Sequence, residues 1–141
     1  MNTEQYNMQG RVCMVTGANT GIGKATAWGL ATAGAEVLMV CRSRERGSAA
    51  RDEIIAATSN AQVSLWIADL ANQEEIRLLA AAIHEQFPAL HVLVNNAAII
   101  PQQWTESPDG YELQFAVNHL APFLLTNLLL ELIKEIGRAH V

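Results

Sequence analysis

The amino-acid sequence predicts an α/β protein, with a doubly wound parallel sheet between two layers of helices. Apolar runs of strand length alternate along the chain with longer segments of helical character. These runs are hydrophobic throughout rather than at every second residue, which is typical of parallel strands covered on both faces. The connections are short and contain no low-complexity linker. Because parallel strands are joined by right-handed crossovers, we expect the strand order 3-2-1-4.

The first elements have clear boundaries in the sequence. Residues 12–16 form a short apolar run that ends in a glycine-rich turn, so we expect a strand there. The alanine-rich stretch from residue 21 or 22 to residue 33 is predicted to be a helix, with Gly34 as its C-terminal cap. A continuous apolar run over 36–41 is the second predicted strand.

The second helix is predicted over 43–59, where Ile54 and Ile55 are the apolar anchors of an otherwise polar segment. The third strand is predicted over 63–67, a short apolar run of strand length. Each crossover from one strand to the next therefore contains one helix, as a parallel sheet requires.

The third helix is predicted over 72–87. Asn72 is a typical N-cap, acidic residues occupy the first turn, and Pro88 follows the end of the helix. A fourth strand is predicted over 91–95, and one long helix from about residue 110 to residue 136.

Composition excludes several functional classes. The chain has 141 residues, of which 50% are hydrophobic and 16% charged, so it can bury one compact core. A formal net charge of −5 argues against nucleic acid as a partner. The longest apolar runs are interrupted before the roughly 18 residues of a membrane span, and no leader precedes the first strand. Cys13 and Cys41 form no metal-ligand cluster, which favours a reducing, cytoplasmic location without a metal site.

The sequence TGANTGIGK stands between the first predicted strand and helix, and each of its glycines has a physical task. Gly17 lets the chain leave the strand sharply, Gly21 lets the backbone approach a phosphate, and Gly23 lets the helix lie close to the strand. The helix N-terminus would then face a pyrophosphate. A tight turn without a ligand is the alternative. An ATP-binding P-loop is excluded, because Ala25 replaces the required Ser or Thr.

The end of the second strand separates two cofactors. An NAD site places a carboxylate there to bind the ribose 2′-hydroxyl, whereas this chain has Arg42. A guanidinium can bind a 2′-phosphate through two hydrogen bonds, so the sequence predicts NADP(H). The alternative is a solvated basic start to the next helix, since Arg44, Arg46 and Arg51 lie nearby.

Four motifs occur in a diagnostic order: TGANTGIGK from Thr16, the pair Asp69-Leu70, the run NNAA at 95–98, and the pair Asn118-His119. In this combination the chain resembles the classical short-chain dehydrogenase/reductase family, from about residue 10 to residue 135. The flanking runs CR, TESPDGYELQF and FLLTNLLL are most similar to the retinol-dehydrogenase-like branch. The resemblance implies a Rossmann fold and NADP(H)-dependent hydride transfer between an alcohol and an aldehyde or ketone, with lipophilic, retinol-like substrates.

The resemblance also implies a set of cofactor-binding residues in the glycine turn: Gly17, Asn19, Thr20, Gly21, Ile22 and Gly23. The pyrophosphate would lie against this turn. Further along the chain, Asp69 would bind the adenine amine and Leu70 would contribute a backbone contact; the alternative for Asp69 is a helix N-cap.

The run after the fourth strand would complete the cofactor site. The resemblance places Asn96, Ala97 and Ala98 near the adenosine ribose and the nicotinamide. Ala98 is a mild departure, because the family usually has glycine there, which allows a closer approach of the backbone.

Asn118 is the one predicted catalytic residue. In the family, the backbone carbonyl of this Asn holds a water that relays protons to the catalytic lysine. A helix carbonyl normally accepts from the N–H four residues later, but that residue here is Pro122, which has none. We therefore expect a local kink and a carbonyl free to bind water. The alternative is a surface Asn in a proline-kinked helix.

The sequence contains no Ser followed by Tyr-x-x-x-Lys, the remainder of the family's catalytic set. We therefore expect residues 1–135 to be the N-terminal part of one NADP-binding domain, and the chain by itself to be inactive. The parent protein is expected to act on a small molecule and to form homo-oligomers. The alternative is a nucleotide-binding module without catalytic activity.

The last six residues, 136–141, are a translation of the start of a common sequencing adapter, so we expect a non-native tail there. The alternative is a genuine helix end, with Gly137 as its cap and with Arg138 and His140 interacting with the helix dipole.

Overall fold

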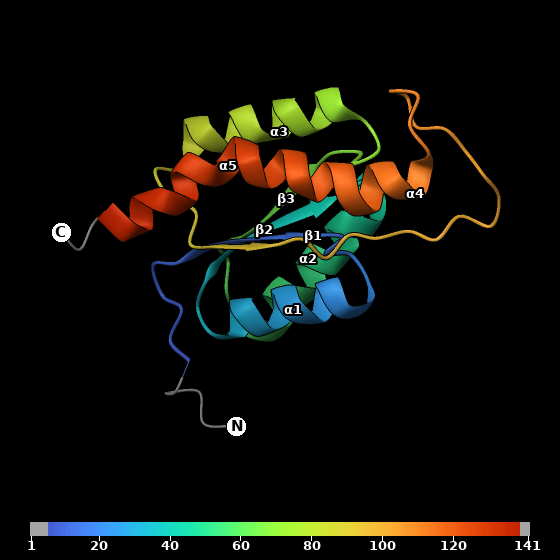
Figure 1. Ribbon diagram of the computed structural model, residues 1–141. Helices are drawn as coiled ribbons and strands as arrows, with labels where there is room; N and C mark the ends of the chain where they lie inside the picture. Colours follow the sequence, from blue (N-terminus) through green and yellow to red (C-terminus); the bar gives the residue numbers. More distant parts are fainter. Residues whose placement is uncertain (1–5, 139–141) are drawn as a thin grey trace.

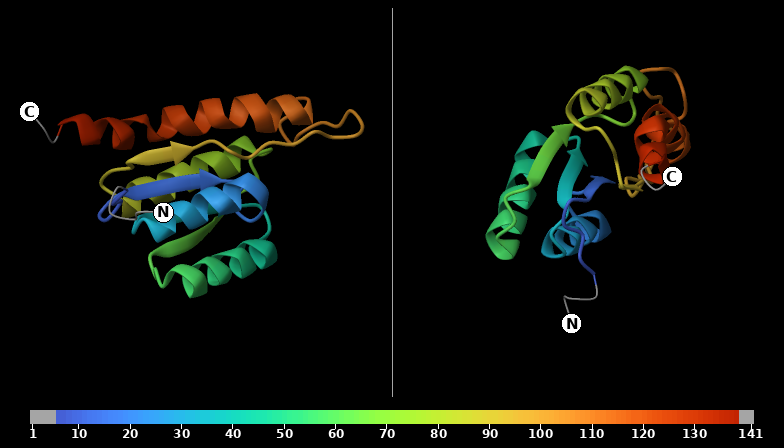
Figure 2. Two further views of the ribbon diagram at one scale, coloured as in Figure 1. Left: turned by 90° about the horizontal axis from the view of Figure 1, so that it is seen from below. Right: turned by 90° about the vertical axis from the view of Figure 1, so that its left-hand side faces the viewer.

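The computed structural model describes residues 6–138, which contain one parallel sheet between two helical layers (Figure 1). The strands lie in the order β3-β2-β1-β4, as the sequence predicts. Their bounds are β1 Val12–Thr16, β2 Glu36–Cys41, β3 Val63–Ile67 and β4 Val92–Val94. Figure 2 shows the layers: one face carries α1 (Gly21–Thr32) and α2 (Arg44–Thr58), the other α3 (Gln73–Gln86) and α5 (Ala121–Arg138). The doubly wound Rossmann fold is confirmed.

The strands contribute side chains to both core layers. Met14 of β1 packs with Leu38 of β2 in the layer beneath α3 and α5. Its neighbours Cys13 and Val15 pack in the opposite layer, beneath α1 and α2. All four side chains are fully buried. A strand buried on both faces has no polar side, which explains why its sequence lacks alternation.

The register of the sheet brings the carboxyl ends of the strands together. Thr16 of β1 lies opposite Val40 of β2, which lies opposite Trp66 of β3. On the other side of β1, Val15 lies opposite Val94 of β4. The segments that leave these strands therefore begin side by side at one edge, where open α/β sheets bind their ligands.

The helix ends largely match the predicted ones. Asn72 is the N-cap of α3, and its Oδ1 accepts two backbone hydrogen bonds of 3.0 and 3.3 Å. Ser43 caps α2, because its Oγ accepts from the N–H of Arg46 at 3.3 Å. Gly34, just after α1, has a φ of +90°, the left-handed conformation that ends a helix. The N-cap of α1, Thr20, makes no side-chain cap hydrogen bond.

The last helical segment differs from the single helix predicted from residue 110. It begins later, with α4 (Leu113–Phe115), and continues through a π-helix, η2 (Ala116–Leu120), into α5. Gly110 has a φ of +83°, which helical backbone does not adopt, so the chain turns there and the helix starts three residues later.

The π-helix lies where Pro122 was expected to disturb the helix. The N–H of Ala121 donates to the carbonyl of Ala116, five residues earlier instead of four. Pro122 has no N–H and so donates no bond to the carbonyl of Asn118. The expected local departure from α-helical geometry is therefore present at this site.

The stretch Leu113–Ile136 is long and apolar enough to cross a membrane, judged by length and composition alone, and 33% of an apolar 18-residue part of it is buried inside the chain. The core helices of soluble proteins can have the same length and apolar composition. Here Leu125, Leu129 and Leu132 are buried in the core layer that contains α3. The absence of a membrane span, which we inferred from shorter uninterrupted apolar runs, stays a prediction.

Helix α5 continues through residues 136–138, so the first half of the expected foreign tail is helical and Gly137 lies within the helix. Residues 139–141 lie outside the described residues. The boundary at residue 135 stays a prediction.

Candidate functional site

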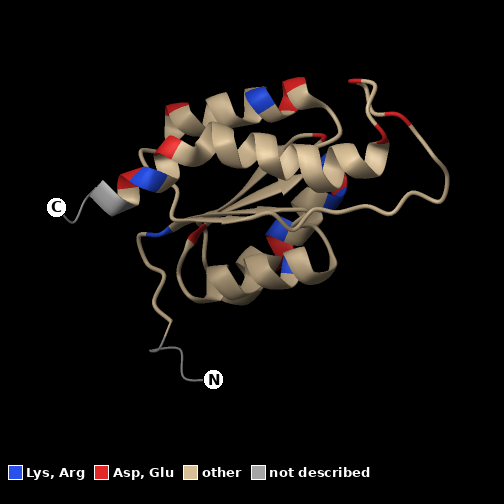
Figure 3. Ribbon diagram, viewed as in Figure 1, with Lys and Arg blue, Asp and Glu red and all other residues tan. Residues whose placement is uncertain are grey.

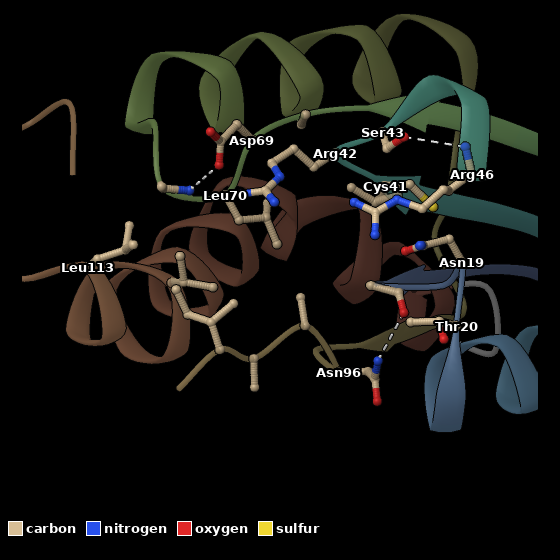
Figure 4. Close-up of a pocket in the computed structure, with 18 residues that line it drawn as sticks. Asn19, Thr20, Cys41, Arg42, Ser43, Arg46, Asp69, Leu70, Asn96 and Leu113 are labelled. Atoms are coloured by element: carbon tan, nitrogen blue, oxygen red, sulfur yellow. Dashed lines mark hydrogen bonds between the residues drawn. The ribbon is translucent and has the colours of Figure 1, made fainter. Parts of the chain in front are cut away.

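A pocket of about 380 Å³ lies at the carboxyl edge of the sheet (Figure 4). The segments after all four strands line it, and the last helical segment adds Leu113 and Val117. These segments bring together most of the predicted cofactor-binding residues: Gly17, Asn19, Thr20, Arg42, Asp69, Leu70, Asn96, Ala97 and Ala98.

Three predicted residues of the glycine turn, Gly21, Ile22 and Gly23, do not line this pocket. The side chain of Ile22 is directed to solvent, since the residue is 79% exposed. Gly21 has a φ of +55°, and a Cβ added to it would meet nothing within 4 Å. It is therefore the backbone conformation, rather than crowding, that favours glycine at this position.

Gly17 and Gly23 have the roles that the sequence predicts. Gly17 has a φ of +64°, so the chain turns sharply at the end of β1. A Cβ on Gly17 would lie 3.0 Å from the Cα of Ala97. A Cβ on Gly23 would lie only 2.2 Å from the carbonyl oxygen of Gly17. Helix α1 therefore packs so closely against the turn that only glycine fits at position 23.

The N-terminus of α1 begins at this pocket without a side-chain cap. Thr20 lines the pocket and is the N-cap residue, but its hydroxyl makes no cap hydrogen bond. Helices α2 and α3 differ, because Ser43 and Asn72 cap them. The first turn of a helix has four N–H groups without helical partners and the positive end of the helix dipole. This end of α1 can therefore bind an anionic group that supplies the missing acceptor.

Thr16 and Asn96 join β4 to the glycine turn. The Thr16 hydroxyl accepts hydrogen bonds from the backbone N–H groups of Asn96 and Ala97, both at 3.0 Å. The Asn96 side chain donates from Nδ2 to the carbonyls of Thr16, at 3.0 Å, and Gly17, at 3.3 Å. Asn96 therefore lines the pocket and also fixes the shape of the turn. Thr16 was not among the predicted site residues, although it is the first residue of the glycine motif.

Asp69 follows β3 and is held in place at the pocket. Its Oδ1 accepts from the N–H of Ala71 at 2.9 Å, and its own N–H donates to Glu75 at 2.6 Å. Figure 4 shows Asp69 at one end of the pocket with Leu70 beside it. The alternative interpretation of Asp69 as a helix N-cap is wrong, because Asn72 has that role.

Arg42 and Arg46 supply positive charge to the pocket. Both line it, and Figure 4 shows both side chains extending into it. Arg42 leaves the end of β2, and Arg46 belongs to the first turn of α2. Figure 3 shows basic and acidic residues together in α2, whereas the segment before α4 carries only acidic ones. The role predicted for Arg42 did not extend to Arg46, which was named only in the alternative of a solvated basic helix start.

Cys41 also lines the pocket, but it is not an activated nucleophile. Burial raises the pKa of its thiol, and a hydrogen bond with the backbone of Ala18 offsets only part of that effect. The side chain is almost fully buried. A thiol with a raised pKa stays protonated at neutral pH, so Cys41 is a packing residue of the pocket wall.

Asn118 reaches the pocket indirectly. Its side-chain Oδ1 accepts from the N–H of Ile99 at 2.9 Å, and its Nδ2 donates to the carbonyl of Ile99 at 2.8 Å. Ile99 lines the pocket. The side chain of Asn118 thus positions the segment after β4, which leaves the backbone carbonyl as the group proposed to hold a water.

Comparison with known proteins agrees with this geometry. The sequence model described as short chain dehydrogenase matches residues 11–141. Retinol dehydrogenase 11 of Mus musculus is 45% identical over 139 residues, which cover 99% of this chain and 44% of that protein. Retinol dehydrogenase 13 of Homo sapiens is 46% identical over 133 residues, which cover 94% of this chain and 40% of that protein.

Among solved structures, a metagenomic short-chain oxidoreductase in complex with NADP superposes with a TM-score of 0.78 at 31% identity, covering 92% of this chain and 59% of that one. The chain thus spans less than half the length of the two retinol dehydrogenases that it matches. The match over residues 11–141 and the identity to these relatives show that the chain belongs to the short chain dehydrogenase family, in its retinol-dehydrogenase-like branch.

Proposed function

We propose that the chain binds NADP(H) and supplies the cofactor-binding part of an oxidoreductase that interconverts an alcohol and a carbonyl compound. The position of Arg42 is the observation that supports NADP(H) over NAD(H) as the cofactor. It follows β2 and lines the pocket, where an NAD site has a carboxylate for the ribose 2′-hydroxyl. A carboxylate would repel a 2′-phosphate, whereas a guanidinium binds it.

The pocket residues fit a dinucleotide of this kind. The uncapped start of α1 at Thr20 offers N–H groups to a pyrophosphate. Gly17 provides the sharp turn before it, and its own N–H donates to the carbonyl of Val40 at 2.9 Å. Asp69, oriented by Ala71, would accept a hydrogen bond from the adenine amine. The ring of a bound nicotinamide supplies or accepts the hydride at the substrate carbon. The backbone carbonyl of Asn118 would hold a water on a proton path.

The substrate we propose is a small lipophilic alcohol, or the matching aldehyde or ketone. The support is similarity: the relatives described above carry the name retinol dehydrogenase. A second candidate function is nucleotide binding without catalysis. It is favoured by the sequence, in which Tyr6 and Tyr111 are followed four positions later by Gly10 and Phe115 instead of lysine. We propose that the 141-residue chain by itself does not turn over substrate.

Titration of the chain with NADPH and with NADH tests the cofactor proposal. We expect NADPH to bind at least about tenfold more tightly, because charge-assisted hydrogen bonds to the 2′-phosphate are absent from NADH. Arg42→Ala should abolish the preference. Arg44→Ala is the matched control, since Arg44 is exposed and does not line the pocket. Equal affinities for the two cofactors, in a chain that binds both, would contradict the proposal.

A turnover assay separates the two candidate functions. The chain is mixed with NADPH and a panel of aldehydes while absorbance of the reduced cofactor is followed. Saturable NADPH binding without turnover is the result we expect of the 141-residue chain. Turnover would show that this chain carries the complete chemistry by itself.

A further inference from the structure

We infer that Asp109 is a positioning residue of the pocket, which fixes the spacing between the wall after β3 and the wall formed by the last helical segment. This inference rests on the proposed binding of NADP(H), and it concerns the end of the pocket that we assign to the adenine. Figure 4 shows Asp69, Leu70 and Leu113 toward that end, whereas the start of α1 lies toward the other. Asp109 itself does not line the pocket.

A hydrogen bond between Gln73 and Asp109 joins the two walls. The backbone N–H of Gln73 donates to Oδ2 of Asp109 at 2.9 Å, although the residues lie 36 positions apart. Gln73 is the first residue of α3 and follows Leu70 by three positions, and Asp109 precedes Leu113 by four. Figure 1 shows the segment between β4 and α4 reaching the end of α3 at which that helix begins. Each wall therefore lies only a few residues from this bond.

Helix α3 leaves the N–H of Gln73 without an acceptor of its own. The N-cap, Asn72, serves the next three N–H groups: its Oδ1 accepts two bonds, and its carbonyl accepts from Ile76 at 3.2 Å. The first N–H of a helix has no helical partner. The carboxylate of Asp109 supplies the missing acceptor and lies at the positive end of the helix dipole.

The wall after β3 is attached to the first turn of α3. The N–H of Asp69 donates to Oε2 of Glu75 at 2.6 Å, and the carbonyl of Asp69 accepts from the N–H of Asn72 at 3.0 Å. Glu75 belongs to the first turn of α3. A contact that holds this turn therefore also holds Asp69, the side chain that we assign to the adenine amine.

Asp109 lies in an ordered β-turn. Its sequence, Ser107-Pro108-Asp109-Gly110, has proline at the second position and aspartate and glycine after it, which is typical of such turns. The N–H of Gly110 donates to the carbonyl of Ser107 at 3.0 Å. Two further bonds, of 2.7 and 3.2 Å, join Ser107 to Tyr111, and Ser107 is buried. The turn thus holds the backbone of Asp109 in place before any ligand binds.

The turn belongs to a hairpin, residues 105–113, that leads directly into α4. Glu106 lies opposite Glu112 in an antiparallel bridge, and the N–H of Leu113 donates to the carbonyl of Thr105 at 2.8 Å. Leu113 is the last residue of the hairpin and the first of α4, and it lines the pocket. A displacement of the hairpin would therefore move this wall.

The distance between the two walls matters for a flat ring that contacts both. A gap of about 0.5–1 Å already loses a quarter to a half of the attraction between neighbouring atoms. Without the carboxylate of Asp109, the hairpin and the first turn of α3 can separate, while the start of α1 and Arg42 keep their places. The expected signature is a lower affinity for every ligand that contains adenine, with the preference between NADPH and NADH unchanged.

The test compares Asp109→Ala with Glu106→Ala, a matched variant of the same hairpin. Glu106 is exposed, does not line the pocket, and its side chain makes no hydrogen bond within residues 6–138. NADPH and NADH are titrated by fluorescence, and adenosine 2′,5′-bisphosphate and inorganic pyrophosphate compete with NADPH. Asp109→Ala should weaken the three adenine-containing ligands by about threefold to tenfold, the effect of one hydrogen bond, and leave pyrophosphate unchanged.

Two further measurements separate positioning from a general loss of stability. Asp109→Asn retains a side-chain oxygen that can accept from Gln73, so it should recover most of the lost affinity. Hydrogen–deuterium exchange without ligand should be faster at residues 68–71 and 113–117 in Asp109→Ala than in the parent chain or in Glu106→Ala. Thermal unfolding reports the overall stability of each variant.

Two binding results would overturn the inference. One is an Asp109→Ala variant that binds all four ligands like Glu106→Ala. The other is an equal loss for all four ligands, pyrophosphate included, because a smaller folded fraction weakens every ligand alike. A parent chain that binds neither NADPH nor NADH would contradict the proposed function instead. Exchange in the unliganded chain then decides the role of Asp109: unchanged exchange at residues 68–71 would overturn it, and faster exchange would support it.

Discussion

The side-chain amide of Asn118 holds the backbone of Ile99 by two hydrogen bonds, one to its N–H (2.9 Å) and one to its carbonyl (2.8 Å). These residues lie 19 positions apart and belong to the π-helix and to the segment after β4. Ile99 lines the pocket, so the pair connects the last helical segment with the cofactor site. An amide satisfies a neighbouring backbone unit in this way because it has both a donor and an acceptor.

Asn118→Ala should destabilise the chain by about 1–3 kcal/mol, because the half-buried N–H and carbonyl of Ile99 lose their partner. The free energy of unfolding is measured by urea denaturation. Asn127→Ala is the matched control on the same helical segment: Asn127 is exposed, and its Nδ2 donates only to the Phe123 carbonyl at 2.8 Å. Equal losses of unfolding free energy in the two variants would show that the hydrogen bonds between Asn118 and Ile99 contribute no more to stability than the bond of Asn127.

Gly23→Ala should destabilise the chain by at least about 2 kcal/mol, because the added Cβ would overlap the Gly17 carbonyl and backbone would have to move. Gly29→Ala is the control on the same helix, since its Cβ would meet nothing within 4 Å. That substitution should instead stabilise the helix by about 0.5–1 kcal/mol. Thermal unfolding of both variants distinguishes these opposite signs, and a neutral Gly23→Ala would contradict the close packing of α1.

His91 should make stability depend on pH. Its Nδ1 accepts a hydrogen bond from the N–H of Val12 at 3.0 Å, which the neutral ring alone can do. Burial, and then the charge of Arg11, lower the pKa of His91 below its ordinary value of 6.5. The unfolded chain therefore binds more protons. The contribution is fully present above pH 6.5 and is lost as the pH falls from there toward the folded pKa.

Urea denaturation at about pH 8 and about pH 5 measures this effect. The control is His91→Gln, which keeps an acceptor but does not titrate, so its loss of stability on acidification should be smaller. An unchanged pH dependence in His91→Gln would assign the effect to other groups.

Cys13 and Cys41 should resist alkylation in the folded chain. Burial raises the pKa of Cys13 to about 11, although the charge of Arg11 lowers it somewhat, and burial also raises the pKa of Cys41. The thiolate that reacts is thus scarce near neutral pH, and both side chains are inaccessible. Mass spectrometry after treatment with iodoacetamide should show no adduct until urea is added. Rapid labelling of the native chain would contradict this burial.

Local signals in the sequence were enough to predict most elements. The apolar run over 12–16, the asparagine before α3 and the glycine after α1 each act through neighbouring backbone, so spacing alone identifies them. The close approach at Gly23 was also predictable, because a strand, a glycine-rich turn and a helix in that order require it.

Contacts between distant segments were not predictable in the same way. Asn96 was assigned to the cofactor, but its bonds to Thr16 and Gly17 join residues about 80 positions apart and depend on the pairing of β1 with β4. The late start of the last helix depends on the turn at Gly110, which an apolar pattern does not reveal. Arg46 lines the pocket because Gly47, which has no side chain, lets α2 pack closely against β2 and β3. The charge pattern of the sequence does not reveal this packing.

Hydrogen–deuterium exchange of the chain, with and without saturating NADPH, tests the central claim most directly. Four segments that leave the carboxyl ends of the strands line the pocket: 17–20, 41–46, 68–71 and 96–99. We expect slower exchange in these segments on addition of NADPH, and little change in the helix ends at the opposite edge of the sheet. NADPH that binds while these four segments exchange as before would contradict a dinucleotide site at this edge.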